Sequence, residues 1–179
     1  MTATKVPLAS LVEQVKGSVP PEKLLEGDYV LLEHISQKTG RVSPSRVELE
    51  EIKSAKGSFA AGDVLYGKLR PQLRKVCVAE RSGFCSLDII VLRPVALGTA
   101  HYLAAVLRSE GFTDQVARLV GGANLPRINA RELLNLELEW PDDEREVSRR
   151  DTIARRALEV RSEAQLLLEQ LDRLELSIL

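Results

Sequence analysis

A heptad pattern near the end of this chain constrains its fold more than any other feature. Eight apolar residues are separated alternately by four and three positions: Ile153, Ala157, Val160, Ala164, Leu167, Leu171, Leu174 and Ile178. This spacing is typical of a helix that pairs with another helix along a narrow seam. A helix lying on its own domain usually carries a broader stripe with a period near 3.6. The pattern therefore predicts a coiled-coil helix with those eight residues at a dimer interface.

The length of this helix supports a partner. A helix from Asp143 to Leu179 would be roughly 55 Å long at 1.5 Å per residue. The preceding ~140 residues would fold with a radius of gyration of about 14 Å, too small to cover such a seam. Pro141 marks the boundary, and Asp142 or Asp143 can cap the helix, with Glu146 at capping-box distance from Asp143. We therefore expect one domain over 1–141 and a dimerising helix over 142–179.

The residues before this helix mix two periodicities, which predicts an α/β domain of the mixed α+β kind. Runs rich in β-branched residues and bounded by turn residues predict strands at 29–35, 64–69, 74–79, 84–92 and 136–140. Helical spacing predicts a short helix or helix turn within 7–15, two helices between Thr99 and Gly121-Gly122, and one at 130–135. Asn129 is a favourable N-cap for the last of these, with Glu132 three residues later.

Composition narrows the class of protein. The 179 residues carry a net charge of −1, with 4% aromatic residues, so aromatic stacking on single strands is not favoured. No apolar run approaches the ~20 residues of a membrane span, and the start lacks an apolar signal region. We therefore expect a cytoplasmic protein that does not bind membranes. Cys77 and Cys85 lie in segments with the residue pattern of strands, and we expect buried free thiols.

Positive charge is concentrated in the middle of the chain. From Lys53 to Arg93 there are eight Lys or Arg against three Asp or Glu, whereas from Asp142 onward there are ten acids against seven Arg. A local basic patch on a neutral protein is compatible with phosphate binding. An ordinary solvated face is the alternative that composition leaves open.

Two segments are candidates for contacts with DNA. In the segment Lys68–Lys75, Pro71 stiffens a turn that gathers several cations, and Arg guanidinium groups can hold phosphates or read guanine edges. The segment Gly121–Arg127 combines small residues with an amide and a guanidinium, although a plain helix connector would also fit. The predicted DNA-binding residues are Lys68, Arg70, Arg74, Lys75, Asn124 and Arg127.

The sequence predicts no catalytic residue and no metal site. The Gly62-x4-Gly67-Lys68 match to a phosphate-binding loop fails at Leu69, where a hydroxyl should hold magnesium. His34 and His101 are isolated from each other and from any Cys pair of metal-ligand spacing. A metal-dependent nuclease built on Asp28 and Glu51, with Lys53 nearby, is the enzymatic alternative.

Several segments together resemble a known family. They are Leu31–Ile35, Gly62–Pro71 with Arg74–Val76, Cys85–Pro94, Tyr102-Leu103 with Leu107–Ser109, Gly121–Ile128 and Trp140-Pro141. In this order they resemble the target recognition domain of the specificity subunit of Type I restriction–modification systems. The terminal helix resembles that family's spacer helix, and the whole looks like a half-length subunit with a single recognition domain.

The resemblance implies a reader of duplex DNA that has no catalytic residues and binds no cofactor. Its implied partners are methyltransferase subunits, which use S-adenosylmethionine to methylate adenine, and restriction subunits, which use ATP. With one recognition domain instead of two, the chain is expected to homodimerise and read an inverted two-part site. The alternative outside this class is a coiled-coil adaptor whose head binds protein.

Overall fold

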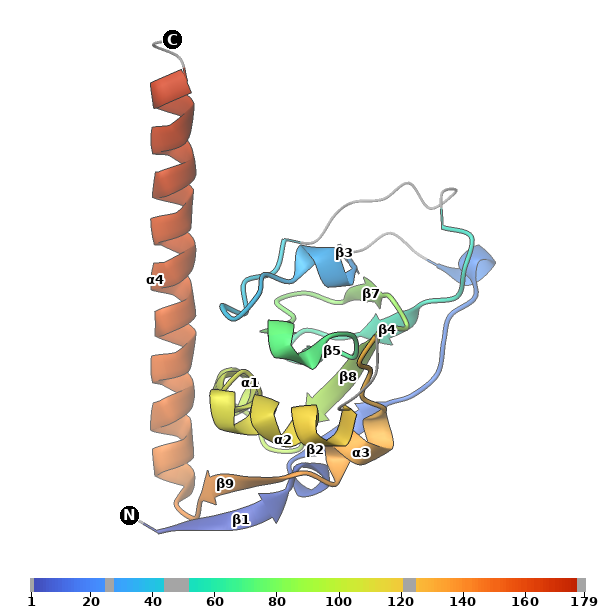
Figure 1. Ribbon diagram of the computed structural model, residues 1–179, viewed down its shortest axis with the longest axis vertical. Coiled ribbons are helices and arrows are strands. Elements are labelled where there is room, and N and C mark those ends of the chain that lie inside the picture. Colours follow the sequence, from blue (N-terminus) through green and yellow to red (C-terminus); the bar gives the residue numbers. More distant parts are fainter. Residues whose placement is uncertain (1, 25–27, 44–51, 121–124, 177–179) are drawn as a thin grey trace.

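The computed structural model describes residues 2–24, 28–43, 52–120 and 125–176 of the 179. It shows a mixed α/β domain beside one long helix, α4 (Glu144–Leu176), which confirms the predicted fold class (Figure 1). The N-terminal part of α4 lies against the domain, and its last turns project past it. Of the helices in these ranges, none is long and apolar enough to span a membrane.

A four-stranded antiparallel sheet forms the centre of the domain. Its strands are β2 (Val12–Val15), β8 (Ile89–Pro94), β5 (Val64–Gly67) and β6 (Val76–Val78), hydrogen-bonded in that order. Side chains alternate between the two faces of a strand. Val64 and Tyr66 therefore enter one core and Leu65 enters the other.

Each face of this sheet has its own cover. Helices α1 (Ala100–Leu107), α2 (Glu110–Val120) and α3 (Ala130–Leu134) bury Leu103, Val116 and Leu133 in the first core. The second core lies toward a smaller sheet in which β7 (Gly83–Cys85) joins β3 (Asp28–Val30) and β4 (Gly57–Phe59). The first strand, β1 (Ala3–Pro7), and the last, β9 (Glu137–Pro141), pair as a ribbon that leads into α4.

Both cysteines are buried in the second core and are not bonded to each other, as expected. Burial raises the pKa of the Cys77 thiol to about 12 and has the same effect on Cys85. Reactivity requires the thiolate, so both thiols are inert at neutral pH.

Three of the predicted elements are corrected by the structure. The helix or helix turn expected within 7–15 is shorter than predicted: β1 ends at Pro7, a 3-10 turn follows at Leu8–Ser10, and the remaining residues form β2, which pairs with β8. Leu8 and Val12 are buried there by the sheet, because strand pairing outweighs a short helical pattern. The strand expected at 29–35 ends at Val30, and the one at 84–92 is interrupted by the turn at 86–88.

Asp63 stabilises the turn that precedes β5. Its side chain is 2% exposed and binds Arg93 through both oxygens, at 2.9 and 2.8 Å. One oxygen also accepts the Ala60 backbone N–H at 2.8 Å, which closes the turn in which Gly62 has φ of +87°. Asp63 thus joins the turn before β5 to the neighbouring strand β8.

Replacing Asp63 with Ala is expected to lower the free energy of unfolding by about 1–3 kcal/mol, because a buried N–H and a guanidinium lose their acceptor. Urea unfolding followed by circular dichroism measures the change. Arg93→Ala should also lower this free energy, because the buried Asp63 carboxylate then loses its charged partner, whereas the half-exposed Arg93 can be solvated when Asp63 is replaced. A loss below about 0.5 kcal/mol for Asp63→Ala would contradict this role.

Candidate nucleic-acid interface

Three separate segments converge on one edge of the domain, and backbone hydrogen bonds hold them together. The Lys68 N–H donates to the Asp88 carbonyl at 2.8 Å, and the Ile128 N–H donates to the Lys68 carbonyl at 3.1 Å. The Arg70 N–H donates to the Pro126 carbonyl at 2.9 Å. We call residues 68–70, 86–88 and 125–128 the basic platform. Its backbone is fixed before any ligand arrives.

Three predicted cations lie on this platform. Lys68 donates from Nζ to the Leu87 carbonyl, and Arg127 pairs with Asp88. Arg70 is exposed and has φ of +49°, and its side chain makes no hydrogen bond or ion pair with the residues the structure describes. A non-glycine residue in that region is strained, and such residues cluster at functional sites. Two cations that keep much of their exposure, Arg70 and Arg127, can therefore reach a phosphate or a base edge.

The other predicted contacts are placed differently. Arg74 donates to Glu110 of α2 at 3.1 Å, and its side chain is 21% exposed. Lys75 donates from Nζ to the Leu32 carbonyl at 2.6 Å. Both side chains tie the turn after β5 to neighbouring elements, which favours a structural role over a DNA contact. Asn124 lies outside the described residues, so the predicted adenine contact stays a prediction.

A groove that sequence reasoning missed adjoins the platform. It has a volume of about 260 Å³, and its lining includes Gln14, Lys16, Lys68 and Leu87. Lys16 is exposed and is followed by Gly17 with φ of +107°, where the chain leaves β2. A lysine directly before a turn glycine was the available signal, but nothing local linked it to Lys68. The groove adds one cation and one amide beside the platform.

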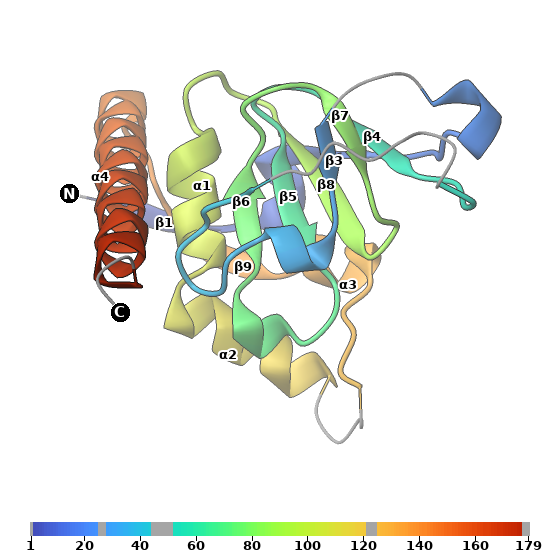
Figure 2. The same cartoon turned by 90° about the horizontal axis from the view of Figure 1, so that it is seen from above.

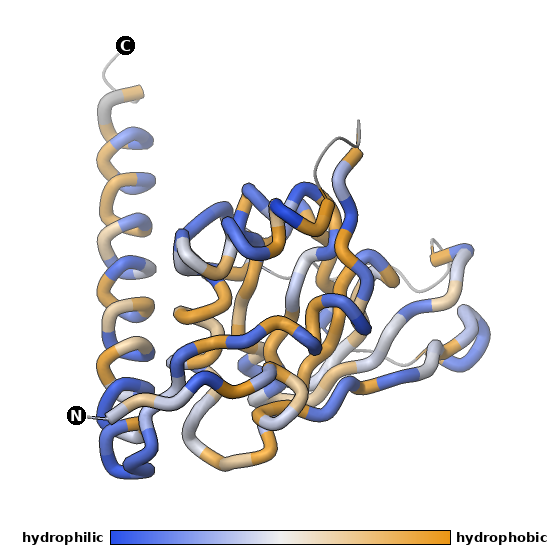
Figure 3. Tube along the Cα trace, turned by 60° about the horizontal axis from the view of Figure 1, so that its bottom comes forward, coloured by the Kyte–Doolittle hydropathy of each residue, from blue (hydrophilic) through white to orange (hydrophobic). Residues whose placement is uncertain are grey.

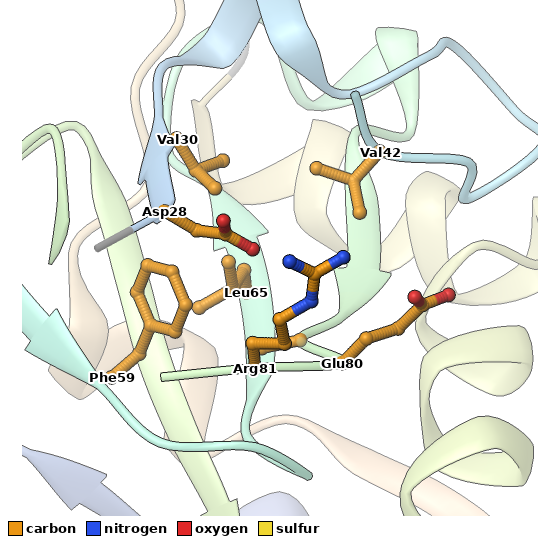
Figure 4. A pocket seen from close by; sticks show the side chains of 8 residues that line it. Asp28, Val30, Val42, Phe59, Leu65, Glu80 and Arg81 are labelled. Atoms are coloured by element: carbon orange, nitrogen blue, oxygen red, sulfur yellow. The ribbon is translucent and has the colours of Figure 1, made fainter. Parts of the chain in front are cut away.

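The residues of the nuclease alternative do not form a metal site in the described part of the chain. Asp28 lines a small cavity of about 90 Å³ whose other walls are mostly apolar, and its carboxylate points toward the Arg81 guanidinium (Figure 4). A guanidinium is an unfavourable neighbour for a bound cation. Glu51 lies outside the described residues. Within the described ranges, no three His, Cys, Asp or Glu side chains are grouped to hold a metal ion.

Helix α4 presents two different faces. Val147, Asp151, Ala154, Leu158 and Ser162 are buried or half-buried on the side toward the domain. The heptad positions lie on another side and are exposed: Ile153 by 54%, Val160 by 47%, Leu167 by 65%, Leu171 by 50% and Leu174 by 65%. Apolar residues recur along the helix to its C-terminal end (Figure 3). The domain therefore leaves the described seam uncovered, as the length argument predicted, while Ile178 lies outside the described residues.

The start of α4 is built around Glu146. Asp143 is the N-cap, since its carbonyl accepts from the Val147 N–H and its side chain accepts from the Arg145 N–H. Glu146 does not complete the expected capping box among the described contacts, because its buried carboxylate binds Arg149 and Arg150, each at 2.7 Å. Hydrogen bonds from Arg149, which has the larger effect, and from Arg150 lower the pKa of Glu146 to about 2.

This shift predicts a loss of stability in acid. Because the folded pKa lies below the unfolded value, the contribution is fully present above about pH 4.5 and is lost as pH falls toward 2. Glu146→Gln should be less stable than the wild type at pH 7 and should lose less stability between pH 5 and 3. Urea midpoints across that range measure both changes. Parallel curves for the two proteins would contradict the assignment.

A domain of mixed sheets with a basic platform and a long helix that projects past it has known counterparts. No family model matches the chain. The chain is 32% identical over 120 residues to the specificity subunit of the Type I restriction enzyme EcoDI of Escherichia coli. That match covers 65% of this chain and 27% of the relative. This similarity to a Type I restriction specificity subunit confirms the resemblance drawn from the sequence.

Solved structures show the same fold. A chain from a type I R–M system, studied for its assembly and conformational transition, superposes with a TM-score of 0.76 at 20% identity, covering 97% of this chain. The HsdS subunit of Thermoanaerobacter tengcongensis superposes with a TM-score of 0.69 at 24% identity, and the match covers 94% of this chain. The type I S subunit of M. genitalium gives 0.60 at 18% identity and covers 97%. This chain spans less than half of each, at 47%, 47% and 42%.

Proposed function

We propose that this chain is a non-catalytic, sequence-specific DNA-recognition subunit of a Type I restriction–modification complex. The observation that carries the proposal is the basic platform: a homologue of specificity subunits presents Arg70 and Arg127 from a rigid backbone at one edge of its domain. Cations fixed in this way can contact phosphates, and their fork geometry matches guanine edges. The expected contacts are Lys68, Arg70 and Arg127, with Asn124 as a reader of adenine.

The proposal includes a homodimer. Ile153, Val160, Leu167, Leu171 and Leu174 are exposed along one heptad seam of α4, and a second α4 is the partner with the same spacing. Two-fold symmetry would place two recognition domains on one duplex and would give the target two identical half-sites in inverted orientation. The pair of helices would then set the separation between the half-sites.

The remaining partners follow from the homology. The pair of rods would dock methyltransferase subunits, and restriction subunits would join the same assembly. S-adenosylmethionine and ATP would be bound by those partners and not by this chain. The cytoplasmic location expected from the sequence remains part of this proposal.

The test is selection of bound sequences from a randomised duplex pool, with the chain alone and with its methyltransferase partner. The proposal expects enrichment of a two-part inverted motif. A coiled-coil adaptor, the other class of function that the exposed seam allows, would enrich no sequence under either condition. Cleavage of the pool by the chain alone in magnesium would instead support the nuclease alternative.

A further inference from the structure

The N-terminus of α1 is capped by a residue of α4. The first N–H groups of a helix have no partner within the helix and need an acceptor. Thr99, at the N-cap position, provides none, since its hydroxyl donates to the Ala96 carbonyl at 2.8 Å. Instead, Oδ1 of Asp151 accepts from the backbone N–H groups of His101 at 2.7 Å and Tyr102 at 2.9 Å. This carboxylate binds the domain to the long helix.

Neighbouring contacts fix the orientation of α4 at Asp151. Asp151 is 8% exposed, and its second oxygen lies 3.8 Å from Nδ1 of His101. The next residue toward the N-terminus, Arg150, donates to the Tyr102 hydroxyl at 2.9 Å and lies over the Tyr102 ring. That ring packs against Trp140 of β9, with 4.8 Å between centroids. Helix α1, strand β9 and helix α4 are therefore held at one small junction.

Beyond this junction the helix stays beside the domain, where Ala154, Leu158 and Ser162 are half-buried. A groove of about 350 Å³ lies between them, lined by Arg41, Val42 and His101 from the domain and by Arg155, Glu159 and Glu163 from α4. They also meet where Arg41 and Glu169 form an ion pair at 3.3 Å. The two contacts are about 27 Å apart along the helix, taking 1.5 Å per residue. The outer one is partly exposed, and such pairs hold geometry weakly.

We propose that Asp151 is the positioning residue that sets the angle between the recognition domain and the α4 rod. The buried cap is the stronger of these two polar attachments, and the groove leaves room for the rod to swing when the cap is lost. The basic platform belongs to the segments beside β8 and α3, on the side of the domain away from α4 (Figure 2). A small rotation at Asp151 therefore moves the platform through a large arc.

This angle has a consequence that rests on the proposed function. If two copies pair through the α4 seam, the angle at each Asp151 fixes the distance and the rotation between the two platforms. A fixed angle selects one separation of half-sites along the duplex, and a loose angle accepts several. Asp151 would then act on the choice of target without touching DNA.

The experiment measures the angle directly in the full chain. Asp114 of α2 and Gln170 of α4 are exposed and can be replaced with Cys for spin labels, while the native thiols are buried. Labelled chains diluted in unlabelled wild type give the distance within one chain by pulsed electron resonance. Asp151→Ala removes the acceptor, Asp151→Asn keeps a side-chain oxygen in the same place, and Asp172→Ala is the matched control on an exposed part of the rod.

The proposal expects a single narrow distance in the wild type, Asp151→Asn and Asp172→Ala, and a broad, displaced distribution in Asp151→Ala. Circular dichroism must show unchanged helix content in Asp151→Ala, and if that variant unfolds, Asp151→Ser supplies a weaker cap for the same reading. A narrow, unshifted distance in a folded Asp151→Ala would overturn the proposal.

A binding series separates this inference from the proposed function. Duplexes whose half-sites differ in separation should show one preferred spacing in the wild type and a flattened preference in Asp151→Ala. If the wild type binds no duplex but the distances change as expected, the proposed function fails and the positioning role stands. If binding is specific and Asp151→Ala keeps both the spacing preference and the distance, the positioning role fails alone.

Discussion

Replacing Leu167 and Leu171 together with Asp is expected to turn a dimer into a monomer without unfolding the domain. Both leucines are at least half exposed in the single chain, so they contribute little to its own core. Burial in a helix pair would contribute about 1.5–3 kcal/mol for each leucine, or about 6–12 kcal/mol for the four in a dimer. Light scattering at micromolar concentration should show the mass fall from that of a dimer, twice 19.8 kDa, to the 19.8 kDa of a single chain.

A matched pair of single substitutions controls for charge and for helix propensity. Leu166→Asp places the same change on an exposed leucine one residue away, at 52% exposure, but outside the heptad seam. It should leave the mass unchanged, whereas Leu167→Asp should weaken the dimer. Equal weakening by both would show that the heptad seam is not the interface, and a wild type that is monomeric at high concentration would reject the dimer itself.

Removing Arg70 and Arg127 together is expected to abolish tight binding to a selected duplex. Each Arg that reads a base contributes about 1–3 kcal/mol, so four such side chains in a dimer imply a loss of about a thousandfold or more. Affinity falls with salt, and each lost phosphate contact also reduces the magnitude of the slope of log affinity against log salt by about 0.9. Fluorescence anisotropy between 50 and 200 mM salt would measure both quantities.

Two other arginines serve as controls for this experiment. Arg161→Ala removes the same charge from the exposed side of the rod and should change neither the affinity nor the salt slope. Arg74→Ala breaks the bond to Glu110 and should lower stability while leaving the slope intact. A reduced slope for Arg74→Ala would restore it as a DNA contact. Unchanged affinity together with an unchanged slope for Arg70→Ala with Arg127→Ala would remove the basic platform from the interface.

The features best predicted from the sequence were those with a strong local pattern. The long helix was predicted because its heptad spacing persists over nearly four repeats, and α1 and α2 because their apolar residues recur at helical spacing. Asn129 was predicted as a cap and accepts the Glu132 N–H at 2.9 Å. In each case a few neighbouring residues determine the structure.

The features that were missed depend on contacts between distant segments. The basic platform joins residues 68–70 to 86–88 and 125–128, and no local pattern reveals which cations converge. Arg74 and Lys75 have the same charge as Arg70, yet each donates a hydrogen bond within the domain, to Glu110 and to the Leu32 carbonyl respectively. Asp151 was hidden for the same reason, since its partners lie about fifty positions earlier in the chain.

The count of chains on one duplex tests the central claim most directly. Native mass spectrometry of the wild type with a duplex selected from the random pool would measure this count without reference to any substitution. We expect one duplex carrying two copies of the chain, and the Leu167→Asp, Leu171→Asp variant should lose that species. A stable complex of one chain on one duplex, at concentrations where free sites are saturated, would contradict it.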